Sequence, residues 1–167
     1  PREKYADHFF AWVYDFNSDG WNDVLTAGFP GTPAYVYENP RAEGHNRAWR
    51  KHQVLDSVSN ESPHFTNLVG DEKPELVWTR DGYFGYAEVN WSEPRAKWTW
   101  HSISERIATP KFGHGLGVGD VNGDSKLDLV TANYNSDNLS LLLGNGNGTF
   151  AAPIEIPANA NPRSLSL

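Results

Sequence analysis

The stretch that decides the fold is residues 15–25, which read DFNSDGWNDVL. Residues 120–130 repeat the same frame as DVNGDSKLDLV, and residues 67–77 carry a weaker copy, NLVGDEKPELV. The three copies begin 52 and 53 residues apart. A fixed period of this length is the signature of a repeat architecture in which each repeat is one supersecondary unit. The sequence therefore predicts tandem repeats at about 5–56, 57–109 and 110–160, with 161–167 beginning a fourth.

A second set of positions keeps the same phase. Once in each repeat an aromatic residue stands three positions before a His or Pro: Trp49 before His52, Trp98 before His101, and Phe150 before Pro153. Because these positions recur, we expect the aromatic residues to pack between strands and the two histidines to be structural strand residues.

The segments between these landmarks are short, β-prone runs separated by turn residues, and none keeps a helical period. Asp81-Gly82 is a strong hairpin signal, and residues 144–148, GNGNG, form a loop signal. In residues 9–14 both alternating sets of side chains are largely apolar, so we expect both faces of that strand to be buried.

Four strands in about fifty residues are typical of a β-propeller blade. We expect an all-β fold of about three blades, each of four antiparallel strands. These blades would form a single partial propeller over residues 1–167. The chain shows no leader pattern, and with Pro1 first and no Met we expect it to be part of something longer.

The acidic stretches place oxygen-bearing residues at alternate positions of a tight loop. Ca²⁺ prefers six to eight oxygen ligands from carboxylates, amides, backbone carbonyls and water. Positions one, three, five and nine would give side chains and position seven its carbonyl, while Gly20 permits the sharp turn. The ligands of the first loop would be Asp15, Asn17, Asp19, Asp23 and the Trp21 carbonyl.

The third acidic stretch has the same donors, with Ser125 instead of Gly at the turn. Its ligands would be Asp120, Asn122, Asp124, Asp128 and the Lys126 carbonyl. The sequence thus predicts about two Ca²⁺ sites. The middle stretch offers Asn67, Asp71 and Glu75 but has Val69 at position three, so we expect a weak or empty site there.

Two other interpretations of these stretches exist. Clusters of Asp, Asn and Gly also form ordinary solvated turns, and a calcium titration separates the two. A helix–loop–helix calcium site needs an acid at position twelve, where Thr26 and Thr131 stand. The flanking residues are also strand-like, so the helix–loop–helix interpretation is excluded.

These acidic stretches, together with residues 141–150, LLLGNGNGTF, resemble the FG-GAP/VCBS repeats of integrin-α-type propellers. The resemblance is strong in the first and third repeats and weak in the second. It implies seven or eight blades in the whole propeller, Ca²⁺ in the loops of some blades, and an extracellular, periplasmic or cell-surface location, with cell adhesion among the family's roles.

Composition narrows the partners. The formal net charge of −7 argues against nucleic acid, because phosphate binding needs a basic surface. No apolar run reaches the roughly 18 residues of a membrane span. Trp21 and Trp91 are candidates for stacking on a sugar ring, although lone surface aromatic residues are common.

The leading functional hypothesis is a non-catalytic module that binds protein or carbohydrate, because the sequence shows no recognisable catalytic motif. The alternative is a part of a propeller-fold enzyme, such as a polysaccharide lyase or a sugar dehydratase. Three blades would also leave open blade edges, so we expect self-association through them.

Overall fold

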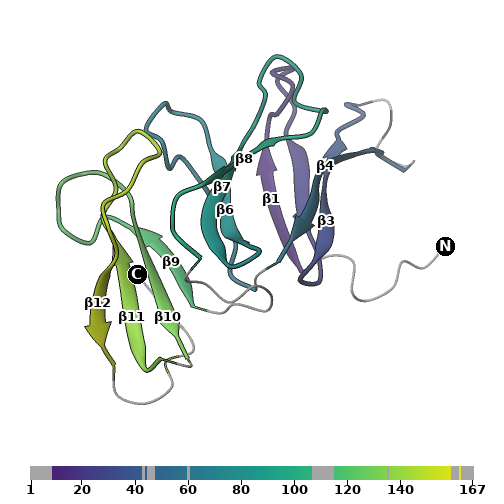
Figure 1. The fold of residues 1–167 in the computed structure, drawn as a ribbon. Helices are drawn as coiled ribbons and strands as arrows, with labels where there is room; N and C mark the ends of the chain where they lie inside the picture. The colour runs from purple at the N-terminus through teal and green to yellow at the C-terminus, as the bar shows by residue number, and fades with distance from the viewer. Residues whose placement is uncertain are drawn as a thin grey trace. The chain divides into compact units, whose positions relative to one another are not determined.

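The computed structural model describes residues 9–42, 44, 48–59, 61–106, 115–134, 136–158 and 162. Every regular element in these residues is a β-strand, and the strands form three four-stranded antiparallel sheets (Figure 1). Within each sheet the strands lie side by side in chain order. This arrangement confirms the all-β prediction and the four-stranded, blade-like unit.

The first sheet holds the first acidic loop between its first two strands. Its strands are β1 (Phe10–Tyr14), β2 (Asp23–Ala27), β3 (Thr32–Glu38) and β4 (Arg50–Val58). The pairing of β3 with β4 is interrupted by an irregularity in register between Thr32 and Tyr35. The pairing of β1 with β2 is regular: Phe10 lies opposite Ala27 and Tyr14 opposite Asp23. The first acidic loop therefore lies at one end of a regular antiparallel pair.

The second sheet repeats this plan with β5 (His64–Thr66), β6 (Glu75–Arg80), β7 (Tyr83–Glu88) and β8 (Thr99–Ser102). Asp81 and Gly82 join β6 to β7 with φ angles of 54° and 91°. Two successive left-handed residues are what a two-residue type I′ hairpin requires, so the Asp-Gly signal is confirmed.

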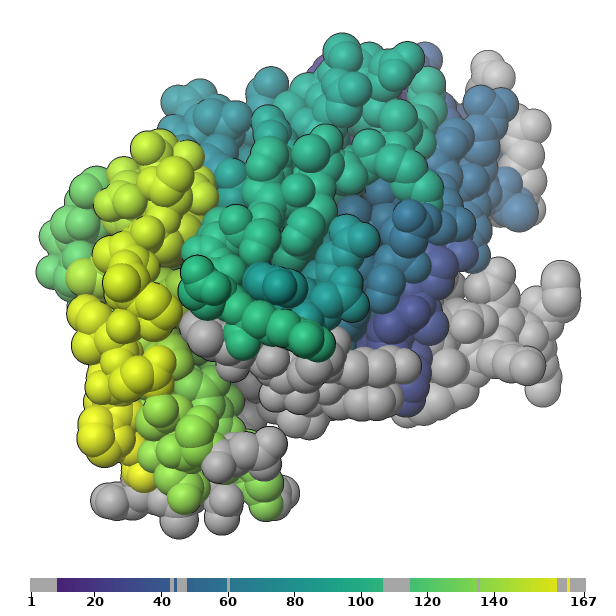
Figure 2. Space-filling view, in the orientation of Figure 1, coloured from purple at the N-terminus to yellow at the C-terminus, as the bar shows by residue number. Residues whose placement is uncertain are grey.

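The third sheet consists of β9 (Leu116–Gly119), β10 (Asp128–Asn133), β11 (Asn138–Leu142) and β12 (Ile154–Pro157). Its outer strand β12 is open to solvent: Ile154 is 48% and Ile156 40% exposed, and Figure 2 shows the yellow end of the described chain on the surface. An exposed apolar edge strand of this kind is a template for pairing with another chain.

The chain divides into two compact units, residues 1–58 with 89–99 (unit 1) and residues 59–88 with 100–167 (unit 2). The core of unit 1 includes Phe16, whose ring lies 5.5 Å from that of the buried Trp98. In unit 2 one cluster joins the second and third sheets, and Phe150 packs against it. The packing role predicted for Trp98 and Phe150 is therefore confirmed. The buried members of the unit 2 cluster are Leu68, Val77, Phe84, Tyr86, Leu116, Leu129 and Leu142.

One prediction about strand β1 is wrong. Its side chains alternate between half-buried and exposed, and Val13 is 62% exposed. β1 is an edge strand of its sheet, and only the face that carries Phe10, Trp12 and Tyr14 is covered by other residues. The apolar residues on its second face misled the sequence interpretation. The described residues contain no helix that is long and apolar enough to cross a membrane.

Candidate metal-binding loops

All three acidic loops share one backbone path. At positions four and six of each loop the φ angle is positive. Left-handed conformations are rare for residues other than Gly, Asn and Asp. Because each of the three loops has two of them, at the same two positions, the loops are of a single type. The residues are Ser18 and Gly20, Gly70 and Glu72, and Gly123 and Ser125.

In the first loop, the side-chain oxygens face the loop's own amides. The Asp15 carboxylate accepts hydrogen bonds from the backbone amides of Asp19, at 3.0 Å, and Gly20, at 2.8 Å. Asn17 Oδ1 accepts from the Asp19 amide at 3.0 Å, and Asp19 Oδ1 from the Trp21 amide at 2.9 Å. The oxygens of positions one, three and five are thus oriented toward the inside of one turn.

The third loop repeats this pattern bond for bond. The Asp120 carboxylate accepts from the amides of Asp124, at 3.1 Å, and Ser125, at 2.9 Å. Asn122 Oδ1 accepts from the Asp124 amide at 2.9 Å, and Asp124 Oδ1 from the Lys126 amide at 2.9 Å. Ser125 therefore occupies the turn position of Gly20 without changing the hydrogen bonds.

The middle loop keeps only part of the pattern. Asn67 Oδ1 accepts from the Gly70 amide at 2.8 Å, and Asp71 Oδ1 from the Lys73 amide at 3.0 Å. Position three is Val69, which offers no side-chain oxygen. The middle loop thus has the backbone of the other two with fewer donors for a cation.

The carboxylates at position nine are all buried. Asp128 accepts from the amides of Val121, at 2.9 Å, and Gly144, at 2.8 Å. Asp23 accepts from the Asn39 amide at 2.8 Å, yet burial raises its pKa despite this bond and one from Phe16. In the first and third loops, position nine therefore ties the loop to the segment that follows β3 or β11.

Glu75 is the position-nine acid of the middle loop. It accepts from the amides of Leu68, at 2.8 Å, and Val69, at 3.3 Å. Burial raises its pKa to about 7 even with these two bonds. A carboxyl group that holds its proton near neutral pH is a poor cation ligand, because the proton occupies the same lone pairs.

Basic side chains lie against the position-five carboxylates. Arg41 Nη2 pairs with Asp19 Oδ2 at 2.9 Å, and Lys126 Nζ with Asp124 Oδ2 at 3.3 Å. Burial opposes the ionised form of Asp19, but bonds from the Trp21 amide and from Arg41 hold its pKa below the ordinary value. The pKa of Asp124 is also lowered, chiefly by the hydrogen bond from the Lys126 amide and further by the bond from the Lys126 side chain.

The donor chemistry of the first and third loops fits a hard cation. Carboxylates at positions one and five, with an Asn oxygen between them, are the ligand types that Ca²⁺ prefers. In the described part of the chain, no group of three or more His, Cys, Asp or Glu side chains is arranged to hold a metal ion. The fit therefore rests on the types of donor that each loop offers, the position-nine aspartate included, and not on a preformed cluster of three acids.

The two predicted stacking residues lie in different surroundings. Trp21 is 40% exposed. Trp91 is half-buried, with its ring centroid 5.4 Å from that of Tyr14 and 6.3 Å from that of Phe16. Trp91 thus packs on the first sheet, while the stacking role of both residues stays a prediction.

The repeated histidines pair with acids on the neighbouring strand. His52 Nε2 lies 3.0 Å from Glu38 Oε2, and His101 Nε2 lies 2.9 Å from Glu88 Oε2. Burial opposes ionisation of Glu38, but His52 and Arg95 together lower its pKa below the ordinary value. The structural role predicted for both histidines is confirmed.

Residues 120–167, which begin at the third acidic loop, match the FG-GAP-like repeat. The match confirms the resemblance seen in the sequence, and it lies where the loop pattern is complete. A comparison with curated proteins found no match.

Solved structures with the same fold include a lectin from Agrocybe aegerita that recognises non-reducing terminal N-acetylglucosamine, with a TM-score of 0.61 and 15% identity. A second is the Tc holotoxin pore of Photorhabdus luminescens, with a TM-score of 0.52 and 16% identity. Each match covers 92% of this chain, but only 40% of the first structure and 7% of the second. The chain thus spans less than half of either protein, and at this identity the likeness is one of fold.

The sequence interpretation did not find the basic side chains that lie against the position-five carboxylates. Arg41 reaches Asp19 across 22 residues of chain, and no local pattern marks that pairing. Lys126 could have been found, because it stands two residues after Asp124, but its role was assigned to its carbonyl alone.

Proposed function

We propose that the chain is a calcium-stabilised FG-GAP-type module that binds a protein or carbohydrate ligand outside the cell or at its surface. The observation that carries the proposal is the bond-for-bond repetition of the first loop in the third. Two loops far apart in sequence orient carboxylate and amide oxygens in the same way, and both end in a buried aspartate.

Calcium would act here as a structural ion. Asp15, Asn17 and Asp19 would hold it in the first loop, and Asp120, Asn122 and Asp124 in the third, with the position-seven carbonyls and the position-nine aspartates completing the set. Neutralising the clustered carboxylates would stiffen the loops that join the first two strands of each sheet. Rigid loops at the end of a sheet are suited to presenting a ligand-binding surface.

The fold of a lectin in a related structure makes carbohydrate the first ligand class to test. The immobilised chain would be exposed to an array of neutral and acidic glycans, once with calcium and once with a chelator. The expected result is saturable binding that falls when calcium is removed, with every glycan recovered intact.

Two outcomes would contradict the proposal. Cleavage of an acidic polysaccharide, seen as unsaturated products, would favour the enzyme alternative. Equal ligand binding with and without calcium would show that the acidic loops do not support the ligand site.

A further inference from the structure

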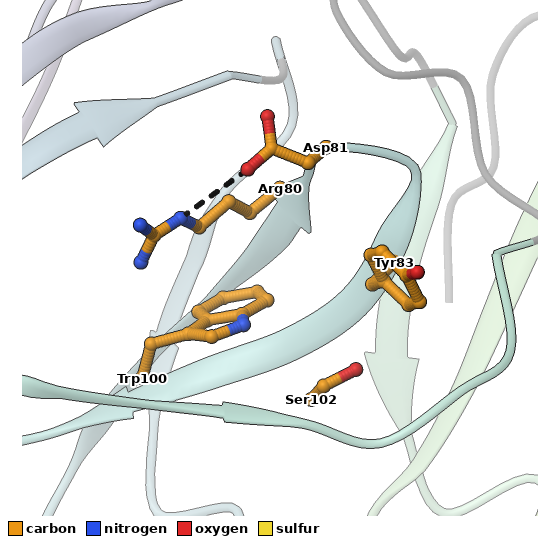
Figure 3. Close-up of a pocket in the computed structure, with 5 residues that line it drawn as sticks. All are labelled: Arg80, Asp81, Tyr83, Trp100 and Ser102. Carbon is orange, nitrogen blue, oxygen red and sulfur yellow. Dashed lines mark ion pairs between the residues drawn. The ribbon is translucent and has the colours of Figure 1, made fainter.

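A small pocket opens beside the hairpin of the second sheet. Its volume is about 330 Å³, and among the described residues it is lined by Arg80, Asp81, Tyr83, Trp100 and Ser102, all from unit 2. Figure 3 shows the rings of Trp100 and Tyr83 on either side of the space, with Arg80 and Asp81 along one side and Ser102 on the other. An aromatic wall with a few convergent polar groups is the usual make-up of a small-ligand site.

The Trp100 ring is fixed from behind. Its centroid lies 4.4 Å from that of Trp78, which is fully buried. On β7, Gly85 leaves the space that the ring occupies, because a Cβ added there would lie 2.5 Å from two ring carbons of Trp100. The same Cβ would lie 2.3 Å from the His101 carbonyl oxygen, so Gly85 allows both the close approach of β8 and the position of the Trp100 ring.

This arrangement is peculiar to the second sheet. In the register of the strands, Trp78 lies opposite Gly85 as Thr26 lies opposite Tyr35 in the first sheet. There Tyr35 fills the place of Gly85, and Lys51, the residue before the repeated histidine, lies over its ring at 3.9 Å. In the second sheet, Trp100 stands where the first sheet has Lys51, and Gly85 stands where it has Tyr35. The face of the Trp100 ring is therefore open to the pocket.

The third sheet closes the same place with polar contacts. Thr131 lies opposite Ser140 at the matching pair. The Ser140 hydroxyl bonds Glu155 Oε1 at 2.8 Å and accepts from Asn133 Nδ2 at 2.7 Å. Packing within a blade thus does not require an aromatic pocket at this position.

The polar groups at the rim supply both donors and acceptors. Arg80 Nε lies 3.7 Å from Asp81 Oδ2, and the Arg80 guanidinium carbon lies 5.8 Å from the Trp100 ring centroid. Asp81 is held by the hairpin turn, and its carbonyl accepts from Arg106 Nε at 3.1 Å. The Asp81 carboxylate is mostly exposed, so it is available to a ligand.

We propose that this pocket binds one neutral pyranose ring of a glycan. The apolar C–H face of the sugar would lie on Trp100 and Tyr83, while its hydroxyl groups would bond to Arg80, Asp81 and Ser102. Arg80 and Asp81 oppose one another in charge, which favours a neutral sugar over an acidic one. This inference rests on the proposed binding function and assigns it a site.

Saturation-transfer NMR and calorimetry with methyl glycosides would test the site. The probes are the methyl glycosides of glucose, galactose, mannose and N-acetylglucosamine, with methyl glucuronide as the acidic comparison. A single stacked ring in a shallow pocket should bind with a Kd of about 1–10 mM. The expected result is that at least one neutral glycoside saturates in this range and more tightly than the glucuronide.

Two pocket variants and one control locate the binding. Trp100→Ala should weaken it at least tenfold. Asp81→Gly removes the carboxylate but keeps a residue that tolerates the left-handed turn, and it should weaken binding several-fold even if the first variant folds poorly. Phe29→Ala, which removes an exposed aromatic side chain in unit 1, should leave binding unchanged.

Four results would overturn the inference. Glycoside binding that survives Asp81→Gly and a folded Trp100→Ala would place the sugar elsewhere while the binding function stands. Tighter binding of the glucuronide would reject the neutral class. Binding of a larger glycan or a protein, without any response to the methyl glycosides up to about 50 mM, would reject the pocket as the site but retain the proposed binding function. Absence of binding to every ligand tested would reject both the pocket and the binding function.

Discussion

The middle and third acidic loops belong to the same unit and follow the same backbone path, yet their chemistry differs. Both have left-handed residues at positions four and six and a buried acid at position nine. The third loop has Asp120, Asn122 and Asp124 oriented by its own amides, whereas the middle loop has Val69 at position three and Glu75, whose pKa is raised to about 7.

This difference shows that the backbone shape of the loop and its capacity to bind a cation depend on different residues. Turn-favouring residues and a buried carboxylate that accepts backbone amides are sufficient to form the loop. The oxygens at positions one, three and five add the capacity for a cation. If the shape of the loop and its capacity for a cation are independent, substitutions at position nine should lower the stability of the fold even without calcium. Substitutions at position five should alter only calcium binding.

The largest effect is expected at position nine of the third loop. Asp128→Ala leaves the part-buried amide of Val121 and the buried amide of Gly144 without their acceptor, and each unmet buried bond costs about 1–3 kcal/mol. We expect the free energy of unfolding in urea to fall by about 3–4 kcal/mol without calcium. Asn122→Ala, in the exposed part of the loop, should cost about 1 kcal/mol or less; similar costs for the two variants would contradict this independence.

Glu75 should give the middle loop a pH dependence of its own. Its folded pKa of about 7 lies above the ordinary 4.5, so between these values the folded state binds more protons and stability falls as pH rises. The full shift corresponds to about 3 kcal/mol, and screening reduces the expected loss to about 2 kcal/mol.

Glu75→Gln removes this titration. Denaturant unfolding of both proteins at pH 4.5 and 7 in calcium-free buffer would measure it, and the variant should lose about 2 kcal/mol less than the parent. Parallel pH profiles would show that Glu75 ionises normally and would reopen the middle loop as a calcium candidate.

A smaller effect is expected at the turn of the third loop. Ser125 has φ of 65° where the first loop has Gly20, and a left-handed residue with a Cβ costs about 1–2 kcal/mol. Ser125→Gly should stabilise the protein by about 0.5–1 kcal/mol, because the greater freedom of Gly in the unfolded chain offsets part of the gain. The reciprocal Gly20→Ser should lower the melting temperature; an unchanged melting temperature in both would show that the turn is unstrained.

The smallest effect is expected from the basic side chains at position five. Lys126→Ala and Arg41→Ala remove a positive charge beside Asp124 or Asp19. Exposed ion pairs are weak, so calorimetry should show calcium affinity rising only about two- to fivefold. A fall in affinity would mean that these side chains organise the loops for the ion.

The fold was predictable where the determinants are local or repeated. The period of the acidic stretches located three blades, and Asp81-Gly82 located a hairpin. The exposed face of β1 was not predictable, because an apolar residue such as Val13 carries no mark of whether another element covers it. The packing of Trp91 on the first sheet likewise depends on a contact between distant parts of the chain.

The candidate sites divide in the same way. Every donor of the acidic loops lies within nine consecutive residues, so spacing alone identified them. The aromatic pocket depends on Gly85 and Trp100, which lie on neighbouring strands and are ordinary residues in sequence. Comparison with Tyr35 and Lys51, their counterparts in the first sheet, is the signal that could have singled them out.

The most direct test of the account is a calcium titration by calorimetry of the chelator-stripped protein, with thermal melts alongside. The account predicts two sites, each lost in one of the variants Asp19→Ala and Asp124→Ala. If the Kd is near 10 µM, about 1 mM calcium would stabilise the fold by roughly 2.7 kcal/mol. A folded protein that binds no calcium, or that keeps both sites in each variant, would contradict the account and leave the acidic loops as turns.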